Sequence, residues 1–255
     1  PPLHEFLPKT DKDIDDIAKE LNLSQDDIKS RITELHEQNP MLGHRGCRLG
    51  ISFPEIYQMQ CQAIFEALAE CKKKKIKLVI PEIMIPLVST AAEIQILRNL
   101  VDETAKKIQK QHSIKIKYYV GTMIELPRAA IRAKEIAKYA DFFSFGTNDL
   151  TQTTFGISRD DSGKFLNDYV ENKIFNKDPF VSIDERGVGE LIKIATERGR
   201  LEKKSLKLGI CGEHGGDPAS IEFCEKVKLN YVSCSPYRVP IARLSAAQAF
   251  LKRKK

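Results

Sequence analysis

The fold is decided by residues 142–149, which read Phe-Phe-Ser-Phe-Gly-Thr-Asn-Asp. The first four residues are uncharged, as in a buried strand, and Gly146 ends the run. Thr147, Asn148 and Asp149 then place short oxygen-bearing side chains on a turn. Such side chains at the end of an apolar strand suit a hard cation or a substrate oxyanion. An Asx turn, in which Asn148 and Asp149 bind local backbone amides, is the structural alternative.

Strand-like and helix-like segments alternate on both sides of this stretch. Further strands are predicted at 78–86, 117–125, 206–211 and 231–234, and helices at 90–109, 188–198, 218–226 and 239–251. Another helix, with Ile131, Ile136 and Ala137, is predicted after Pro127. Strand and helix in turn, with short connections, predict an α/β fold with parallel strands. Residues 45–49 would be a sixth strand. The pattern leaves an open doubly wound sheet and part of an eight-stranded barrel as alternatives, with polar residues 152–186 as a long excursion.

The N-terminal region is expected to differ from this alternation. Residues 1–40 are predicted to form a small helical insertion, with Thr10 and Ser24 as N-caps and Asn39-Pro40 as the end of the second helix. A glycine-punctuated segment follows, and a helix is predicted from Pro54 to Lys74.

The composition is that of an ordinary globular protein. The chain has 255 residues, 42% hydrophobic and 30% charged, which is enough for a sizeable core. Its net charge of +6 owes much to basic runs at 72–75 and 252–255, which are typical of solvated faces. No aromatic residues alternate with these runs and no apolar run approaches about 18 residues. We therefore expect neither a nucleic-acid partner nor a membrane span.

The cysteines and the chain ends indicate the cellular compartment in which the protein is expected. None of the six cysteines forms a C-x-x-C pair or a zinc spacing, which favours a reduced, intracellular protein. The end of the chain, 252–255, differs from a Ser-Lys-Leu peroxisomal signal. The chain opens on Pro1 rather than Met, so we expect a piece of a longer protein. A cytoplasmic location is predicted, and an organellar signal on that longer protein is left open.

Two carboxylates follow neighbouring predicted strands. Glu125 ends the strand at 117–125, and Asp149 ends the next one. Neighbouring strands lie about 4.8 Å apart, so these side chains could share one small cation. Mg²⁺ takes one or two carboxylates and leaves its other positions to water and substrate oxygens. The alternative is that both acids only cap the helices that follow.

A thiol and an arginine complete the candidate site. Cys211 ends a strand within the glycine-rich run 209–218, where a thiol can accept or donate a proton. A buried structural cysteine beside surface residues Glu213 and His214 is one alternative, and a Cys–His nucleophile pair is another. Glycines lie close to Arg45 on both sides, which suits an exposed guanidinium group that binds a carboxylate or a phosphate. This set would handle a small α-keto acid, because a metal and an arginine would stabilise its enolate while the thiol moves a proton.

Long motifs in the chain resemble one family. They closely resemble the C-terminal phosphoenolpyruvate/pyruvate-binding domain of the phosphoenolpyruvate-utilising enzymes, over essentially the whole chain. Phosphoenolpyruvate synthase and enzyme I of the sugar phosphotransferase system resemble it less, since they are expected to differ at Phe145 and to lack Glu-His-Gly-Gly after the cysteine. The equivalent synthase domain remains an alternative. The motifs that carry the resemblance are Asn39–Gly50, Gly121–Ala130, Phe142–Asp161, Gly209–Pro218 and Val232–Arg243.

The resemblance implies a (β/α)8 barrel with a defined site. It implies that Glu125 and Asp149 bind Mg²⁺ and that Cys211 is the acid/base at C3 of the substrate. The implied reaction interconverts ATP, phosphate and pyruvate with AMP, pyrophosphate and phosphoenolpyruvate. A phosphohistidine passes its phosphoryl group to the enolate of pyruvate, or takes one from phosphoenolpyruvate. The implied substrate-binding residues are Arg45, Glu125, Gly146, Thr147, Asn148 and Asp149.

The chain also departs from that pattern. It carries no ATP-grasp region and no phosphohistidine motif, and the family's first two strands would lie upstream of Pro1. We therefore expect an incomplete barrel of about six of the eight βα units, all within one domain, 1–255. The phosphohistidine domain would be a partner elsewhere in the parent chain, and a homodimer would form through the barrel. Alone, the chain would not run the full reaction; the alternative is a catalytically silent, dimer-forming module.

Overall fold

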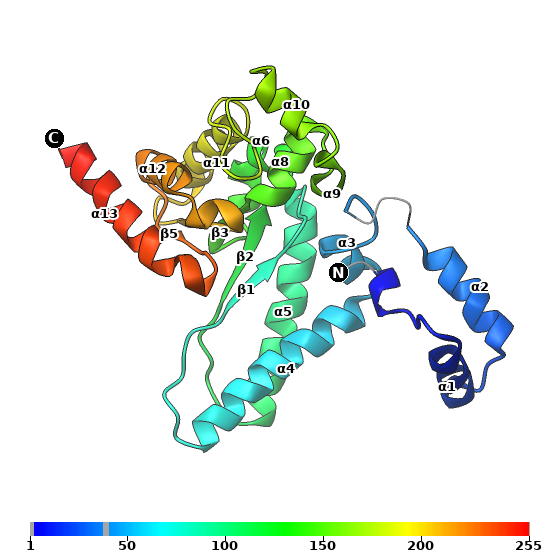
Figure 1. The fold of residues 1–255 in the computed structure, drawn as a ribbon. Helices are drawn as coiled ribbons and strands as arrows, with labels where there is room; N and C mark the ends of the chain where they lie inside the picture. Colours follow the sequence, from blue (N-terminus) through cyan, green and yellow to red (C-terminus); the bar gives the residue numbers. More distant parts are fainter. Residues whose placement is uncertain (1–2, 38–40, 255) are drawn as a thin grey trace.

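The chain folds around one sheet of five parallel strands, as its computed structural model describes for residues 3–37 and 41–254 (Figure 1). Each strand pairs with the next one in the sequence, in the order β1-β2-β3-β4-β5. The strands are β1 (Glu82–Ile85), β2 (Tyr119–Ile124), β3 (Phe142–Gly146), β4 (Lys207–Cys211) and β5 (Tyr231–Val232). The predicted α/β fold with parallel strands is confirmed. In a doubly wound sheet the strand order reverses at a switch point, so this sequential order does not fit that alternative.

The middle of the sheet is the most buried part of the chain. Every residue of β3 is buried, as its apolar sequence requires for a strand covered on both faces. Register aligns the carboxyl ends of the central strands: Ile124 lies opposite Phe145, and Gly146 lies opposite Cys211. Residues that follow these strands therefore emerge side by side at one edge of the sheet.

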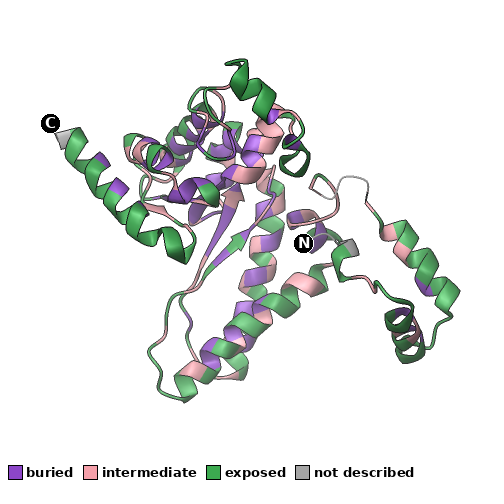
Figure 2. Ribbon diagram, viewed as in Figure 1, coloured by how far each residue is buried: buried purple, intermediate pink, exposed green. Residues whose placement is uncertain are grey.

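Helices connect the strands and bury their apolar faces against them. The helix after β1 begins with a capping box, in which the Thr90 side chain accepts from the Glu93 N–H and the Glu93 side chain accepts from the Thr90 N–H. Figure 2 shows the buried residues concentrated in the sheet and in the helices packed on it. The helices after α3 (Cys47–Ser52) include α4 (Pro54–Lys73), α5 (Ala91–Gln111), α6 (Pro127–Ile131), α7 (Ala133–Ala137), α8 (Thr147–Phe155), α11 (Val188–Glu202) and α12 (Pro218–Lys226), and also α13 (Val239–Lys254), which packs on α12 and is mostly exposed.

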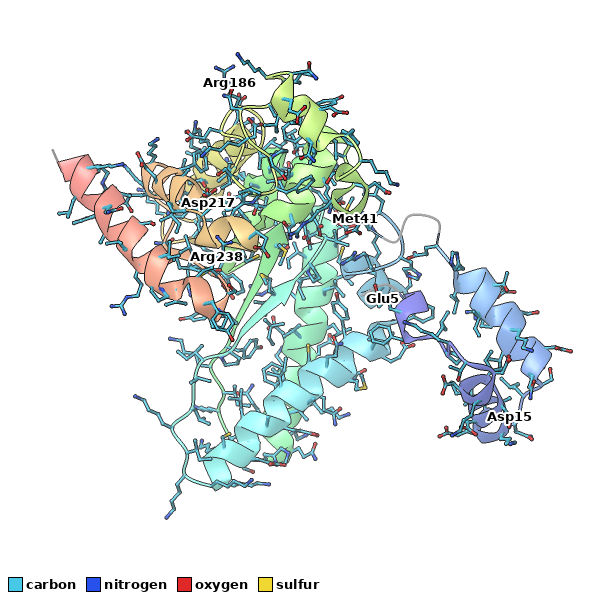
Figure 3. The ribbon with its side chains drawn as sticks, viewed as in Figure 1. Glu5, Asp15, Met41, Arg186, Asp217 and Arg238 are labelled. Atoms are coloured by element: carbon cyan, nitrogen blue, oxygen red, sulfur yellow. The ribbon has the colours of Figure 1, made fainter. Side chains whose placement is uncertain are left out.

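The N-terminal insertion is a helical hairpin. Helices α1 (Asp11–Leu21) and α2 (Gln25–Leu35) start at the predicted caps Thr10 and Ser24, both in complete capping boxes. Apolar residues of the two helices pack on each other in a small core separate from the main one. The hairpin projects from the rest of the molecule, as the position of Asp15 illustrates (Figure 3). The predicted stop at Asn39-Pro40 lies outside the described residues.

One prediction about local structure is wrong, and the structure adds detail to two others. Residues 45–49 form no strand, because Gly46 turns the chain with φ 57° and helix α3 (Cys47–Ser52) follows, with the Cys47 N–H bound to the Pro86 carbonyl. The described residues therefore hold five strands instead of six. The segment 127–137 is two short helices that break at Arg132. The excursion after Gln152 contains the end of α8, followed by α9 (Arg159–Ser162) and α10 (Leu166–Glu171).

Two findings concern the wider predictions. All six cysteines are free thiols, in agreement with the reduced state expected from their spacing. Among the helices of residues 3–37 and 41–254, none combines the length and the apolar character that a bilayer span requires.

Candidate functional site

The predicted site residues gather at the carboxyl end of the sheet. Glu125 follows β2, Gly146 ends β3, and Cys211 ends β4. Arg45, from the loop before α3, lines a cavity of about 840 Å³ together with Glu125 and Asp149. The position of these residues therefore agrees with the expectation that a parallel sheet builds its site where its strands end.

Glu125 is a deeply buried carboxylate, with 3% of its surface exposed. Its Oε1 atom accepts a hydrogen bond of 2.6 Å from the backbone N–H of Leu87, just beyond β1. Burial and then contact with the Asp149 carboxylate hold the pKa of Glu125 well above its usual value. The Leu87 N–H and the charge of Arg45 oppose this rise without cancelling it. The protein surroundings of Glu125 therefore do not balance its charged form, and they favour the neutral carboxyl.

Asp149 faces Glu125 from the first turn of α8. The sequence predicted a turn for the three polar residues after Gly146. The structure instead places them at the start of a helix. The Oδ1 atom of Asp149 accepts a hydrogen bond from Gln152, one turn further on. The close approach depends on Gly146, because a Cβ atom there would lie 2.8 Å from Oε2 of Glu125. A glycine at the end of β3 is thus what lets the two acidic side chains meet.

Asn148, the residue before Asp149 in the first turn of α8, has an unpaired side-chain group. Its Oδ1 atom is buried and has no hydrogen-bond partner among the described residues. The amide lies near Gly212, whose φ of 96° is one that residues with a side chain rarely adopt. A buried polar atom without a hydrogen-bond partner is energetically costly. The unpaired Oδ1 atom therefore favours a ligand-binding role for Asn148 over the alternative of an Asx turn alone.

Thr147 is held inside the protein. Its side chain is fully buried, and its Oγ1 atom lies 2.6 Å from Nδ1 of His214. A weaker contact of 3.4 Å joins the same hydroxyl to the Cys211 carbonyl. The side chain is therefore already engaged, and a substrate contact by Thr147 would come from its backbone.

Cys211 is half-buried at the end of β4. Its Sγ atom lies 3.6 Å from the Phe145 carbonyl on the neighbouring strand. Burial raises the pKa of this thiol, and the charges of Glu125 and Asp149 raise it further. Both ring nitrogens of His214 are engaged elsewhere, so the Cys–His nucleophile pair does not fit this geometry. His214 is also fully buried, which corrects its reading as a surface residue.

The donor set fits Mg²⁺ better than a softer metal. Within the described residues, no group of three or more His, Cys, Asp and Glu side chains could hold a metal by itself. Two carboxylates that face one another, beside an unpaired amide oxygen, match an ion that keeps water and substrate oxygens as its other ligands. The raised pKa of Glu125 reports the same need for a nearby positive charge.

Sequence reasoning missed two residues that support the site. Leu87 donates to Glu125 from a left-handed backbone conformation with φ 57°, and its carbonyl lies 3.1 Å from Sγ of Cys47. Its place just after a predicted strand was the available signal. His214, which lies three residues after Cys211, was noticed but assigned to the surface.

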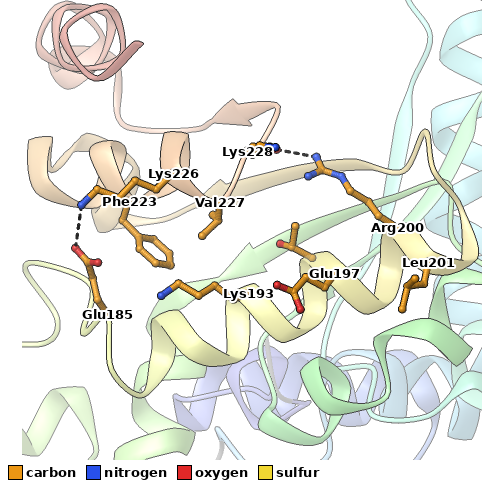
Figure 4. A pocket seen from close by; sticks show the side chains of 10 residues that line it. Glu185, Lys193, Glu197, Arg200, Leu201, Phe223, Lys226, Val227 and Lys228 are labelled. Atoms are coloured by element: carbon orange, nitrogen blue, oxygen red, sulfur yellow. Dashed lines mark hydrogen bonds and ion pairs between the residues drawn. The ribbon is translucent and has the colours of Figure 1, made fainter. Parts of the chain in front are cut away.

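A second cavity lies away from these residues. It has a volume of about 830 Å³ and separates α11 from α12 (Figure 4). Three of its basic residues have partners in the protein: Lys193 lies over the Phe223 ring, Arg200 donates to the Lys228 carbonyl at 2.7 Å, and Lys226 lies 3.9 Å from Glu185. None of the predicted residues lines it, so the candidate site is the cavity at the carboxyl end of the sheet.

Comparison with known proteins identifies the family. The family of PEP-utilising enzymes, represented by its PEP-binding domain, matches residues 6–250. The chain therefore belongs to the phosphoenolpyruvate-utilising enzymes, as its motifs predicted. Its curated relatives include several pyruvate, phosphate dikinases. That of Rhizobium meliloti (strain 1021) is 61% identical over 249 residues, which cover 98% of this chain and 28% of the relative.

Two more dikinases extend this comparison. The Clostridium symbiosum protein is 54% identical over 254 residues, covering 100% of this chain and 29% of that protein. Pyruvate, phosphate dikinase 1, chloroplastic, of Arabidopsis thaliana is 57% identical over 250 residues, 97% of this chain and 26% of the relative. The chain thus spans less than a third of the length of these relatives.

Proposed function

We propose that this chain forms the pyruvate and phosphoenolpyruvate half-site of a pyruvate, phosphate dikinase. The observation that carries the proposal is the meeting of Glu125 with Asp149 at the ends of β2 and β3, in a cavity that Arg45 also lines. The three relatives described above support the choice of reaction, because each matches nearly the whole chain and each is a pyruvate, phosphate dikinase.

The residues of the cavity would bind and orient a small keto acid. Arg45 would hold the carboxylate or the phosphate through its guanidinium fork. The orphan Oδ1 of Asn148 marks a position for a donor or a cation, and the backbones of Gly146 and Thr147 border the same place. Glu125 and Asp149 would hold Mg²⁺, which supplies positive charge next to the substrate oxygens.

Cys211 would move the proton at the methyl carbon. Its raised pKa favours the thiol, which suits proton donation to C3 of the enolate. In that step the C2=C3 electron pair forms the new C3–H bond, an oxygen lone pair restores the carbonyl, and the thiol becomes a thiolate. In the opposite direction, the thiolate takes a methyl proton and leaves an enolate oxygen to accept the phosphoryl group.

The wider organisation forms part of the same proposal. Five sequential parallel strands would belong to a (β/α)8 barrel whose other strands come from elsewhere in the protein. A phosphohistidine domain of a longer chain would deliver the phosphoryl group to the cavity. The protein would work in the cytoplasm, or in an organelle as the chloroplastic name of the Arabidopsis relative indicates for that protein.

Exchange of the pyruvate methyl protons with solvent tests the half-site directly. It needs only the binding groups, Mg²⁺ and Cys211, and it can be followed by NMR in deuterated water. We expect Mg²⁺-dependent exchange in the full-length protein that carries this sequence, and its loss in Cys211→Ala. Exchange that persists in Cys211→Ala would remove the acid/base role from this residue.

The alternative of a structural, dimer-forming module rests on α13. This helix exposes Ile241, Leu244 and Leu251, which are spaced three and seven residues apart and so lie on one side. A second chain could cover this side. A concentration-dependent dimer in sedimentation equilibrium, without proton exchange, would favour the module over the half-site.

A further inference from the structure

His214 occupies an unusual position for a loop residue. It belongs to the short 3-10 helix Glu213–Gly216 that follows β4, yet none of its surface is exposed. Gly212, between Cys211 and this helix, has a φ of 96°, so the chain reverses sharply just after the thiol. The imidazole therefore points back into the protein beneath the loop that carries Cys211.

Both ring nitrogens of His214 are engaged. Nε2 lies 2.9 Å from the Pro179 carbonyl, which can only accept, so Nε2 carries the hydrogen. Nδ1 lies 2.6 Å from the Thr147 hydroxyl, which donates to it. Burial lowers the pKa of His214, and this keeps the ring neutral and the Nδ1 lone pair free for that bond.

These two bonds join three segments that are distant in sequence. Thr147 begins α8, next to the Gly146 that pairs with Cys211 and two residues before Asp149. Pro179 belongs to the segment between α10 and α11. His214 thus fixes the loop of the thiol against the strand end that bears the acidic side chain.

We propose that His214 is a positioning residue for proton transfer at Cys211. It holds the Cys211 loop at a fixed distance from the substrate bound between Arg45, Glu125 and Asp149. This inference rests on the proposed function, because it assigns a role within that same site. Catalysis needs the reacting atoms held within a fraction of an ångström, so a loosened loop slows the proton transfer without removing a binding group.

The test compares three substitutions in the full-length protein. His214→Ala removes both bonds, His214→Asn keeps an acceptor for Thr147, and His214→Gln keeps a donor for Pro179. His112→Ala, at the C-terminal end of α5 and outside the site, is the matched control. The rate of methyl-proton exchange, its dependence on pyruvate concentration and the isotope effect with trideuterated pyruvate are measured per folded molecule.

We expect His214→Ala to lower the maximal exchange rate by about 100-fold, with little change in the pyruvate concentration for half-maximal rate. The isotope effect should grow, because proton transfer becomes the slowest step. His214→Asn should recover part of the rate, and His112→Ala should keep all of it. A residue that only stabilised the fold would lower the amount of folded protein and leave these kinetic quantities unchanged.

The outcomes separate this inference from the proposed function. A wild-type protein without exchange overturns both. A wild-type protein that exchanges, beside folded His214 variants with its rate and isotope effect, overturns the positioning role alone. If His214→Ala fails to fold, the Asn and Gln variants decide, since each keeps one of the two bonds.

Discussion

Two carboxylates at opposite ends of the same sheet have opposite surroundings. Asp141 precedes β3 and lies 3.0 Å from Arg98 and 3.3 Å from Lys203, and it accepts a hydrogen bond of 3.0 Å from the Val120 N–H. Burial alone would raise the pKa of Asp141, but these partners outweigh it and hold the pKa below its usual value. At the carboxyl end, burial and the Asp149 carboxylate prevail, and the pKa of Glu125 is raised.

The difference separates a structural end of the sheet from a functional one. A carboxylate surrounded by cations and an N–H contributes to stability and needs no ligand. Acidic side chains that face one another in a cavity cost stability, and that cost is removed when a cation binds between them. The amino end of the sheet therefore contributes to stability, while the carboxyl end would gain stability from a cation, as the proposed Mg²⁺ site requires.

The largest effect is expected from Asp149→Ala. It removes half of the acidic pair while sparing the fold, because repulsion with Glu125 also disappears. We expect methyl-proton exchange and Mg²⁺-dependent binding of phosphoenolpyruvate to fall by about 10²–10³-fold, with no decrease in the thermal midpoint. Calorimetric titration and a thermal melt measure the two quantities.

Asp168→Ala, which changes an exposed carboxylate on α10, is the control and should bind as the wild type does. Binding that survives in Asp149→Ala would mean that the carboxyl end of the sheet is a structural site after all.

Asp141→Ala should have the opposite signature. Arg98 and Lys203 would lose their common partner, and the Val120 N–H would lose its acceptor. We expect the free energy of unfolding to fall by about 3 kcal/mol, as for other partly buried charges left unpaired. The exchange rate per folded molecule should not change. Urea denaturation gives the first quantity, and a loss of exchange without a loss of stability would contradict the comparison.

Much of the contrast between the two ends of the sheet could be predicted from the sequence, because it depends on where the strands end. The apolar run at 142–145 predicted β3, and the acids after the predicted strands identified Glu125 and Asp149 correctly as neighbours. Capping boxes at Thr90 and Ser24 likewise depend on local chemistry, which is legible in a single chain.

Other parts could not be predicted, because they depend on contacts between distant segments. Gly46 fits a sixth strand until its left-handed backbone and the hydrogen bond from the next residue, Cys47, to the Pro86 carbonyl are known. Nothing near His214 in the sequence indicates that Pro179 and Thr147 will enclose it. Burial against distant segments determined both the turn at Gly46 and the position of His214. Such burial leaves no periodic pattern in the local sequence.

The two carboxylates should also respond differently to pH. The raised pKa of Glu125 gives stability below its unfolded value of about 4.3, and this is lost as pH rises through the folded pKa. The lowered pKa of Asp141 gives stability above about 3.9, lost as pH falls through the folded pKa. Without Mg²⁺, the unfolding free energy should therefore rise by up to about 1.4 kcal/mol per pH unit as the pH falls from 8 to 5, and it should decline below pH 4.

Substitutions assign each limb of this pH profile. Glu125→Gln keeps the acceptor for the Leu87 N–H but cannot ionise, so it should flatten the slope between pH 8 and pH 5. Asp141→Asn should weaken the decline on the acid side. A Glu125→Gln protein with an unchanged slope would show that another group causes it.

The smallest effect is expected at the amino end of the sheet, when Asp141 loses only one of its cationic partners. Lys203→Met removes one of the two cations near Asp141 and the hydrogen bond to the Ala140 carbonyl, while Arg98 stays at 3.0 Å. Lys203 is partly exposed and its pair is screened, so we expect a loss of only about 0.5–1 kcal/mol. Lys204→Met, one residue further on and exposed, should change nothing measurable. A loss as large as that of Asp141→Ala would mean that Arg98 alone cannot balance the carboxylate, and that both cations are needed to make this end of the sheet the stable one.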